Sequence, residues 1–102
     1  MYSKMSKKHT IIKLKTNIHN LIAVGVNMLN AIIIGKVIQE YREKKGVSQE
    51  VVSGLADIGR THLSAIERGV RRPTLDTFFR IADALDIPAS ELMKMIENYD
   101  KA

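Results

Sequence analysis

A row of polar side chains follows a short break in the stretch SQEVVSGLADIGRTHLSAIERG, which spans residues 48–69. The spacing of the apolar residues predicts two short amphipathic helices within this stretch. The outer side of the second helix carries Arg60, Thr61, His62 and Ser64. Guanidinium, hydroxyl and imidazole groups can all donate hydrogen bonds, so this row suits the recognition of a polar partner.

Catalytic and metal-binding motifs are absent from the sequence. It contains no glycine-rich phosphate loop, no paired carboxylate motif and no nucleophile–base constellation, so we expect neither enzyme activity nor a cofactor. His9, His19 and His62 lack the spacing of metal ligands. The chain has no cysteine, which fits a reducing compartment, and we expect a cytoplasmic protein without a metal or small-molecule ligand.

The break between the two helices covers residues 57–59. Two helices joined by so short a turn form a helix-turn-helix when both bury one face in the same core. The second helix is then held with its polar side in solvent, where it can fit the major groove of B-DNA. Five apolar residues predict the shared inner face: Val52, Ala56, Ile58, Leu63 and Ile66.

Stop and cap signals predict five helices in residues 33–98. The first ends before Gly46, a natural left-handed stop, and Ser48 caps the second. The third extends from about residue 59 to residue 68, and Gly69 stops it.

Two more helices complete an all-α domain. Thr74 caps the fourth, and residues 86–88 open a fifth that reaches about Asn98. The apolar residues expected to point inward from the fourth helix are Leu75, Phe78, Phe79, Ala82 and Leu85. The apolar residues of the fifth are Leu92, Met95 and Ile96, of which Met95 fills either the core or an interface.

The net charge of +5 is distributed unevenly along the chain. Residues 1–15 contain five lysines and no acid, whereas the rest of the chain holds eleven basic and eleven acidic residues. Within residues 60–72 four arginines accompany one acid, and from residue 73 onward six acids outnumber three bases. A neutral domain with one basic patch and an acidic far end can orient itself on a polyanion.

The N-terminal segment before residue 32 differs in composition from the rest of the chain. Residues 16–35 carry no Asp, Glu, Lys or Arg, which imitates a signal peptide or a membrane span. Asparagines and a histidine interrupt this stretch and no small-x-small cleavage site follows, so we expect no membrane insertion. An amphipathic helix with its apolar stripe at Ile18, Leu21, Ile22 and Leu29 is favoured instead.

We expect this stripe to pair with its copy in a second subunit, because exposed apolar patches usually mark interfaces. The alternatives are that it folds back on the core, or that Met28 is the true start of the protein. The predicted organisation is therefore a basic arm and helix over residues 1–31, a DNA-binding domain over 32–98, and a tail over 99–102.

Residues 33–96 resemble the Xre family of lambda-repressor-like helix-turn-helix domains. The matching stretches are IGKVIQEYREKKGVSQE, IERGVRRPTLDTFFRIADAL and IPASELM. The resemblance covers about two thirds of the chain. It implies a five-helix domain that binds double-stranded DNA.

The resemblance also implies roles for individual side chains. Arg60, Thr61 and Ser64 fall where the family contacts bases, and Gln49 falls where it binds a backbone phosphate. Further phosphate contacts are expected from His62, Arg71 and Arg72. Solvated surface residues without a partner are the alternative at each of these positions.

Several structural positions can be compared with the family. Arg42 and Glu67 fall where some members place a buried ion pair, the alternative being two independent surface charges. Ser53 replaces a preferred alanine, Asp57 a preferred left-handed glycine, and Gly59 a capping serine or threonine. Serine is nearly as small as alanine, aspartate enters the left-handed region at a cost of about 1 kcal/mol, and glycine is a serviceable cap, so we expect the turn to form.

These observations predict a sequence-specific transcriptional regulator that acts as a homodimer, with recognition helices about 34 Å apart. Two biological roles fit this prediction equally, a phage-type repressor and a controller of a restriction–modification system. An antitoxin that binds a partner protein through the N-terminal segment is the alternative outside this class, and a neighbouring toxin-sized open reading frame would favour it.

Overall fold

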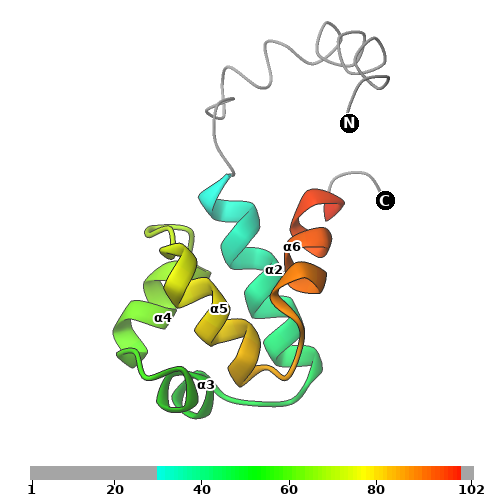
Figure 1. Ribbon diagram of the computed structural model, residues 1–102. Coiled ribbons are helices and arrows are strands. Elements are labelled where there is room, and N and C mark those ends of the chain that lie inside the picture. The colour runs from blue at the N-terminus through cyan, green and yellow to red at the C-terminus, as the bar shows by residue number, and fades with distance from the viewer. Residues whose placement is uncertain (1–29, 100–102) are drawn as a thin grey trace, which may run out of the picture. The chain divides into compact units, whose positions relative to one another are not determined.

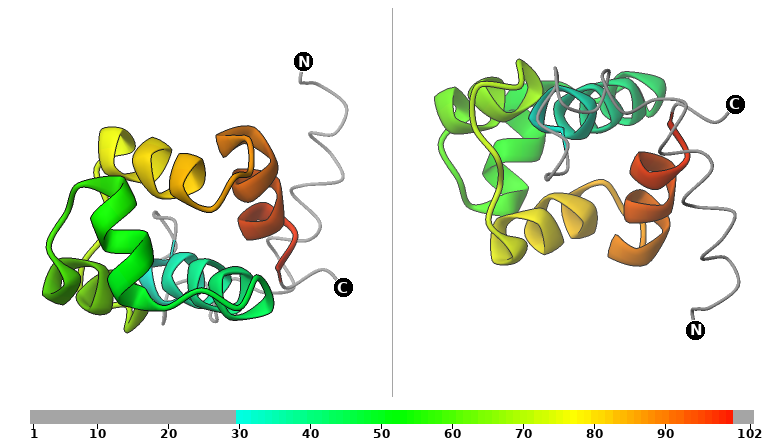
Figure 2. Two further views of the ribbon diagram at one scale, coloured as in Figure 1. Left: turned by 90° about the horizontal axis from the view of Figure 1, so that it is seen from below. Right: turned by 90° about the horizontal axis from the view of Figure 1, so that it is seen from above.

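The computed structural model describes residues 30–99, which contain five helices and no strand. In chain order these are α2 (Ala31–Lys44), α3 (Gln49–Ala56), α4 (Arg60–Glu67), α5 (Leu75–Ala84) and α6 (Ala89–Glu97). Figures 1 and 2 show α3 against α4 and α5, with α2 packed against α4 and α6. None of these helices is long and apolar enough to cross a membrane. The all-α prediction is confirmed, and the expected N-terminal helix lies outside the described residues.

Every helix contributes to one apolar core. Burying a leucine or isoleucine side chain stabilises a fold by about 1.5–3 kcal/mol, so the fully buried residues decide where each helix sits. Leu63 and Ile66 belong to α4 and fix its inner face, as the sequence predicted. The largest fully buried side chains are Ile38, Leu63, Ile66, Ile81, Leu85, Leu92 and Val52.

The predicted caps lie at the helix ends. Gly46 has a φ of +73°, and α2 ends just before it. The Ser48 hydroxyl accepts a hydrogen bond from the Val51 N–H at 3.1 Å, and Thr74 Oγ1 accepts one from the Thr77 N–H at 3.0 Å. These side chains satisfy N–H groups that lack a partner within their helices.

The turn between α3 and α4 has the expected left-handed residue. Asp57 has φ 58° and ψ 47°, and its N–H bonds to the Gly54 carbonyl. Gly59 precedes α4 in an extended conformation. Ser53 is buried, and its hydroxyl donates to the Glu50 carbonyl at 3.2 Å, so this position accommodates serine. All three departures from the family pattern are compatible with the motif.

A close contact between the backbones of α2 and α4 fixes the position of α4. A Cβ atom added at Gly35 of α2 would overlap the Ile66 carbonyl oxygen and lie 2.7 Å from that of Glu67. Only glycine allows the two helices to approach so closely at this point. The C-terminal end of α4 is thereby packed directly against α2.

The predicted inner face of α5 is partly wrong. Phe78, Ala82 and Leu85 are buried, but the side chains of Leu75 and Phe79 are 68% and 56% exposed. The apolar stripe of α5 is wider than the strip that the other helices cover. The buried strip is displaced toward residues that the prediction omitted, namely Thr77 and Ile81.

Candidate nucleic-acid interface

The outer face of α4 carries the three residues expected to contact bases. Arg60 and Thr61 are exposed in the first turn, and Ser64 is half-buried one turn later. Because Leu63 and Ile66 hold the opposite face in the core, this surface is rigidly presented. The structure therefore brings Arg60, Thr61 and Ser64 together on one side of one helix.

Ser64 has a neighbour that the sequence analysis did not single out. Its hydroxyl oxygen accepts a hydrogen bond from Arg68 Nε at 3.3 Å. This contact leaves the hydroxyl proton of Ser64 able to donate to an acceptor on a partner. Arg68 is exposed at the end of α4. It follows Ser64 by four residues, and this spacing on a helix predicts a contact between the two side chains.

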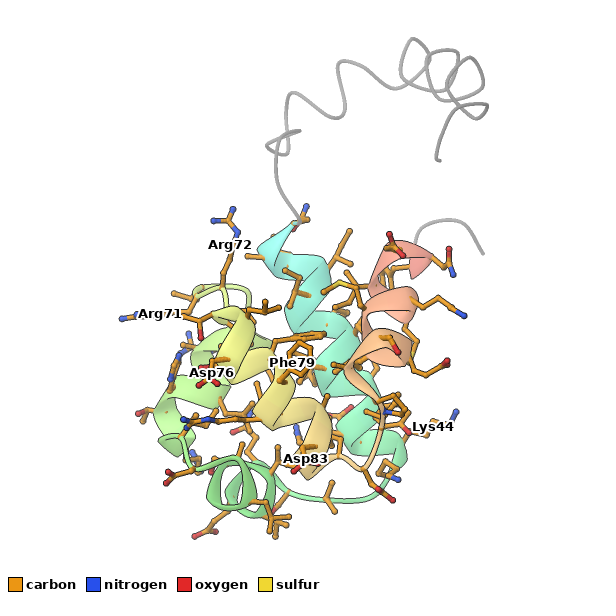
Figure 3. The ribbon with its side chains drawn as sticks, viewed as in Figure 1. Lys44, Arg71, Arg72, Asp76, Phe79 and Asp83 are labelled. Atoms are coloured by element: carbon orange, nitrogen blue, oxygen red, sulfur yellow. The ribbon has the colours of Figure 1, made fainter. Side chains whose placement is uncertain are left out.

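Three more of the side chains expected to contact phosphates lie on or directly after α4. Arg71 and Arg72 are exposed in the loop that follows the helix, and Figure 3 shows their guanidinium groups projecting from the domain. His62 is half-buried in α4. Exposed acidic residues lie on α5, where Figure 3 shows Asp76 and Asp83, and also close to α4, at Glu50 of α3 and Asp57 of the turn. The four arginines of residues 60–72 are all exposed, so this stretch still presents more positive than negative charge.

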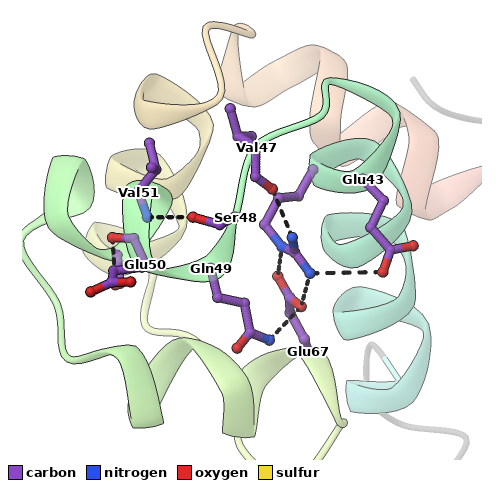
Figure 4. Close-up of polar contacts among 9 residues, drawn as sticks. Glu43, Val47, Ser48, Gln49, Glu50, Val51 and Glu67 are labelled. Atoms are coloured by element: carbon purple, nitrogen blue, oxygen red, sulfur yellow. Dashed lines mark hydrogen bonds and ion pairs between the residues drawn. The ribbon is translucent and has the colours of Figure 1, made fainter.

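Arg42 and Glu67 form a buried, two-pronged ion pair between α2 and the end of α4 (Figure 4). Arg42 Nε donates to Glu67 Oε2 at 2.7 Å, and Nη2 donates to Oε1 at 3.0 Å. Their side chains are 10% and 1% exposed, so they are not two independent surface charges. The hydrogen bond to Glu67 raises the pKa of Arg42 above its ordinary value, despite the opposing effect of burial.

The Arg42 guanidinium also connects this pair to the loop before α3. Its Nη1 donates to the Val47 carbonyl oxygen at 2.7 Å. The ion pair thus links α2, the loop and the recognition helix in one network.

Gln49 belongs to the same network. Its Nε2 donates to Glu67 Oε1 at 2.9 Å, so the side chain expected to bind a phosphate is attached to the buried carboxylate (Figure 4). The two residues are 18 positions apart in the sequence, and no local pattern predicts their contact. The expected phosphate contact of Gln49 remains a prediction, since the second N–H of its amide can still donate.

The side chains on this surface are mainly hydrogen-bond donors and cations. Between residues 30 and 99, no group of three His, Cys, Asp or Glu side chains could hold a metal ion. What the surface presents is a set of hydrogen-bond donors and positive charges on a rigid helix. Such groups match the phosphates and base edges of a duplex.

Comparison with known proteins agrees with this geometry. A family model described as helix-turn-helix matches residues 38–92, which is more than half of the chain. A transcriptional regulator of the helix-turn-helix type from Sinorhizobium fredii, y4dJ, is 34% identical over 61 residues, covering 60% of this chain and 79% of its own. Control protein C.BamHI of Bacillus amyloliquefaciens is 33% identical over 63 residues, covering 61% of this chain and 78% of its own.

Solved structures give the same result. The restriction–modification controller protein C.AhdI from Aeromonas hydrophila matches with a TM-score of 0.61 and 34% identity, covering 64% of this chain and 98% of that one. The wild-type controller protein C.Esp1396I matches with a TM-score of 0.66 and 25% identity, covering 71% of this chain and 95% of that one. The chain therefore belongs to the helix-turn-helix family, in its Xre or lambda-repressor-like branch, and is a DNA-binding transcriptional regulator.

Proposed function

We propose that this protein binds a palindromic operator as a homodimer in the cytoplasm, without enzyme activity. In this proposal Arg60, Thr61 and Ser64 contact base edges in the major groove. The phosphate contacts come from Gln49, His62, Arg71 and Arg72. The observation that carries the proposal is the anchoring of α4, whose apolar side is fully buried while its polar side faces solvent.

A homodimer is favoured because one α4 helix reaches too few base pairs to select a single operator. A two-fold dimer places two recognition helices about 34 Å apart, one turn of B-DNA. The exposed apolar surface of α5, formed by Leu75 and Phe79, is where we propose that the second copy binds. Exposed apolar patches on small domains commonly mark such contacts.

The surroundings of Phe79 suit a two-fold contact between identical surfaces. Phe79 lines an open groove of about 380 Å³, together with Asp83, Ile87 and Pro88. In a two-fold contact, the Phe79 ring of each copy can enter the groove of the other.

Three of the relatives described above are named as control or controller proteins. This likeness supports a controller of a restriction–modification system as the biological role, ahead of a phage-type repressor. The antitoxin alternative depends on the N-terminal segment, and none of the described residues favours it.

Selection of bound sites from a random duplex pool tests the proposal. We expect enrichment of a palindrome whose half-sites are one helical turn apart, and footprinting should find it in the promoter of the protein's own gene. The Arg60→Ala variant serves as the control, since it should bind the selected site weakly. Recovery of no enriched sequence by the wild-type protein would refute a sequence-specific regulator.

A further inference from the structure

Gln49 is the first residue of α3, and a hydrogen bond anchors its side-chain amide to a buried carboxylate. Its Nε2 donates to Glu67 Oε1 at 2.9 Å, and Glu67 is itself held by two hydrogen bonds from Arg42. The Glu67 side chain is only 1% exposed, whereas Gln49 is half-buried and reaches toward the surface. One carboxylate therefore connects a buried guanidinium to a side chain at the edge of solvent.

The chemistry of this contact fixes the orientation of the Gln49 amide. An ionised carboxylate only accepts hydrogen bonds, so the amide must turn its NH₂ group, and not its oxygen, toward Glu67. One of the two N–H bonds is used in this contact. The other N–H is held in a set direction and is available to an acceptor outside the protein.

We propose that the Arg42–Glu67 ion pair positions the Gln49 amide for a phosphate of DNA. This inference rests on the proposed function and gives the buried pair a role at the DNA surface. A free glutamine would lose several rotamers on binding a phosphate, whereas the anchored amide has already lost them on folding. Arg42 and Glu67 are thus positioning residues, and only Gln49 touches the ligand.

A thermodynamic cycle separates this role from a purely structural one. Gln49→Ala is made in the wild-type protein and in the Arg42→Met/Glu67→Leu double variant. Replacing both charges by apolar side chains of similar size is commonly neutral or stabilising for a fold, so the double variant should retain its helices while losing the anchor. Circular dichroism and thermal melting check that it does. Affinity for the selected operator is then measured for all four proteins.

In the wild-type background, Gln49→Ala should weaken binding roughly tenfold to a hundredfold, the effect of one hydrogen bond to a charged group. In the double variant the loss on the same substitution should be about twofold to tenfold smaller, because a free amide must first be ordered before it binds the phosphate. Arg71→Ala is the matched control and should cost the same factor in both backgrounds. It should also lower the salt slope by about one, whereas Gln49→Ala should leave that slope unchanged because the amide is neutral.

An equal loss on Gln49→Ala in both backgrounds would overturn the proposal, as would no loss in the wild-type background. If the double variant does not fold, Arg42→Leu/Glu67→Met replaces it. That variant also leaves no unpaired charge in the core and removes the acceptor of the Gln49 amide, so it should likewise reduce the effect of Gln49→Ala.

A measurement without DNA tests the anchor by itself. The side-chain NH₂ protons of Gln49 should exchange with solvent more slowly in the wild-type protein than in the double variant. Equal exchange rates of these protons in the two proteins would refute the anchoring of Gln49 by Glu67, even if the wild-type protein binds its operator. Failure of the wild-type protein and all variants to bind any duplex would instead refute the proposed function.

Discussion

Arg80 of α5 donates a hydrogen bond from Nη1 to the carbonyl oxygen of Asp57, the left-handed residue of the turn, at 3.4 Å. Arg80 also pairs with Asp76 one turn earlier on α5, at 3.2 Å. The turn that sets the direction of the recognition helix is therefore in contact with the helix to which we assign dimerisation. Because this contact uses the backbone of Asp57, it does not depend on which side chain residue 57 carries.

Asp57→Gly should leave stability unchanged or raise it by up to about 1 kcal/mol. Glycine adopts a positive φ without strain, and the greater freedom of the unfolded chain offsets part of that gain. The melting temperature would then rise by at most about 4–8 °C. Asp86→Gly is a matched control, since Asp86 also has a φ of 58°. A clear fall in melting temperature for Asp57→Gly alone would mean that the Asp57 carboxylate makes a stabilising contact.

Arg60→Ala should cost about 1–3 kcal/mol on the best operator and relax the base preference at one position, which we expect to be a guanine. Arg72→Ala should instead weaken binding to all duplexes alike and lower the salt slope by about one. Titration of both variants against the operator and against single-base changes distinguishes the two effects. Unchanged base preference at every position for Arg60→Ala would exclude base contact by this residue.

Arg42→Met should destabilise the fold by about 3–5 kcal/mol, because it leaves the Glu67 carboxylate buried without its counterion. The Arg42→Met/Glu67→Leu double variant should recover most of that loss. Chemical denaturation of the two proteins measures the difference. Equal stability of the single and double variants would show that Glu67 finds another partner when Arg42 is removed.

Phe79→Glu should shift the protein toward monomer in sedimentation, because a charge at the proposed contact disfavours burial against a second copy. Since the Phe79 side chain is already exposed, the melting temperature of the monomer should change little. Val51→Glu is the control, an exposed apolar residue on α3. A dimer that is unaffected by Phe79→Glu would exclude α5 as the interface.

The ends of the helices were predictable because local signals set them. Gly46, Ser48 and Thr74 each act within a few residues of their own position, and each lies where the sequence analysis placed a stop or cap. The left-handed conformation of Asp57 was expected through the resemblance to a family that prefers a left-handed glycine there, and not from a local signal.

Contacts between distant segments were not predictable from local patterns. Leu75 and Phe79 have the spacing of inward residues, but whether they are covered depends on how far the neighbouring helices extend. The attachment of Gln49 to Glu67 arises only when α3 and α4 are packed together, and no spacing rule indicates it. The Arg42–Glu67 pair was expected solely through resemblance to a family.

Deletion of residues 1–27 should leave a helical protein that dimerises more weakly and binds a palindrome with lower affinity. The core of residues 31–99 is built from its own five helices, so the truncated chain retains every fully buried side chain described here. The lost residues include three of the four apolar residues that we expect to pair between subunits, namely Ile18, Leu21 and Ile22. They also include five lysines that can add phosphate contacts without sequence preference. Sedimentation and operator titration at two salt concentrations measure both losses. Unchanged dimerisation would assign the contact to α5 alone, and unfolding of the truncated chain would show that the N-terminal segment belongs to the core.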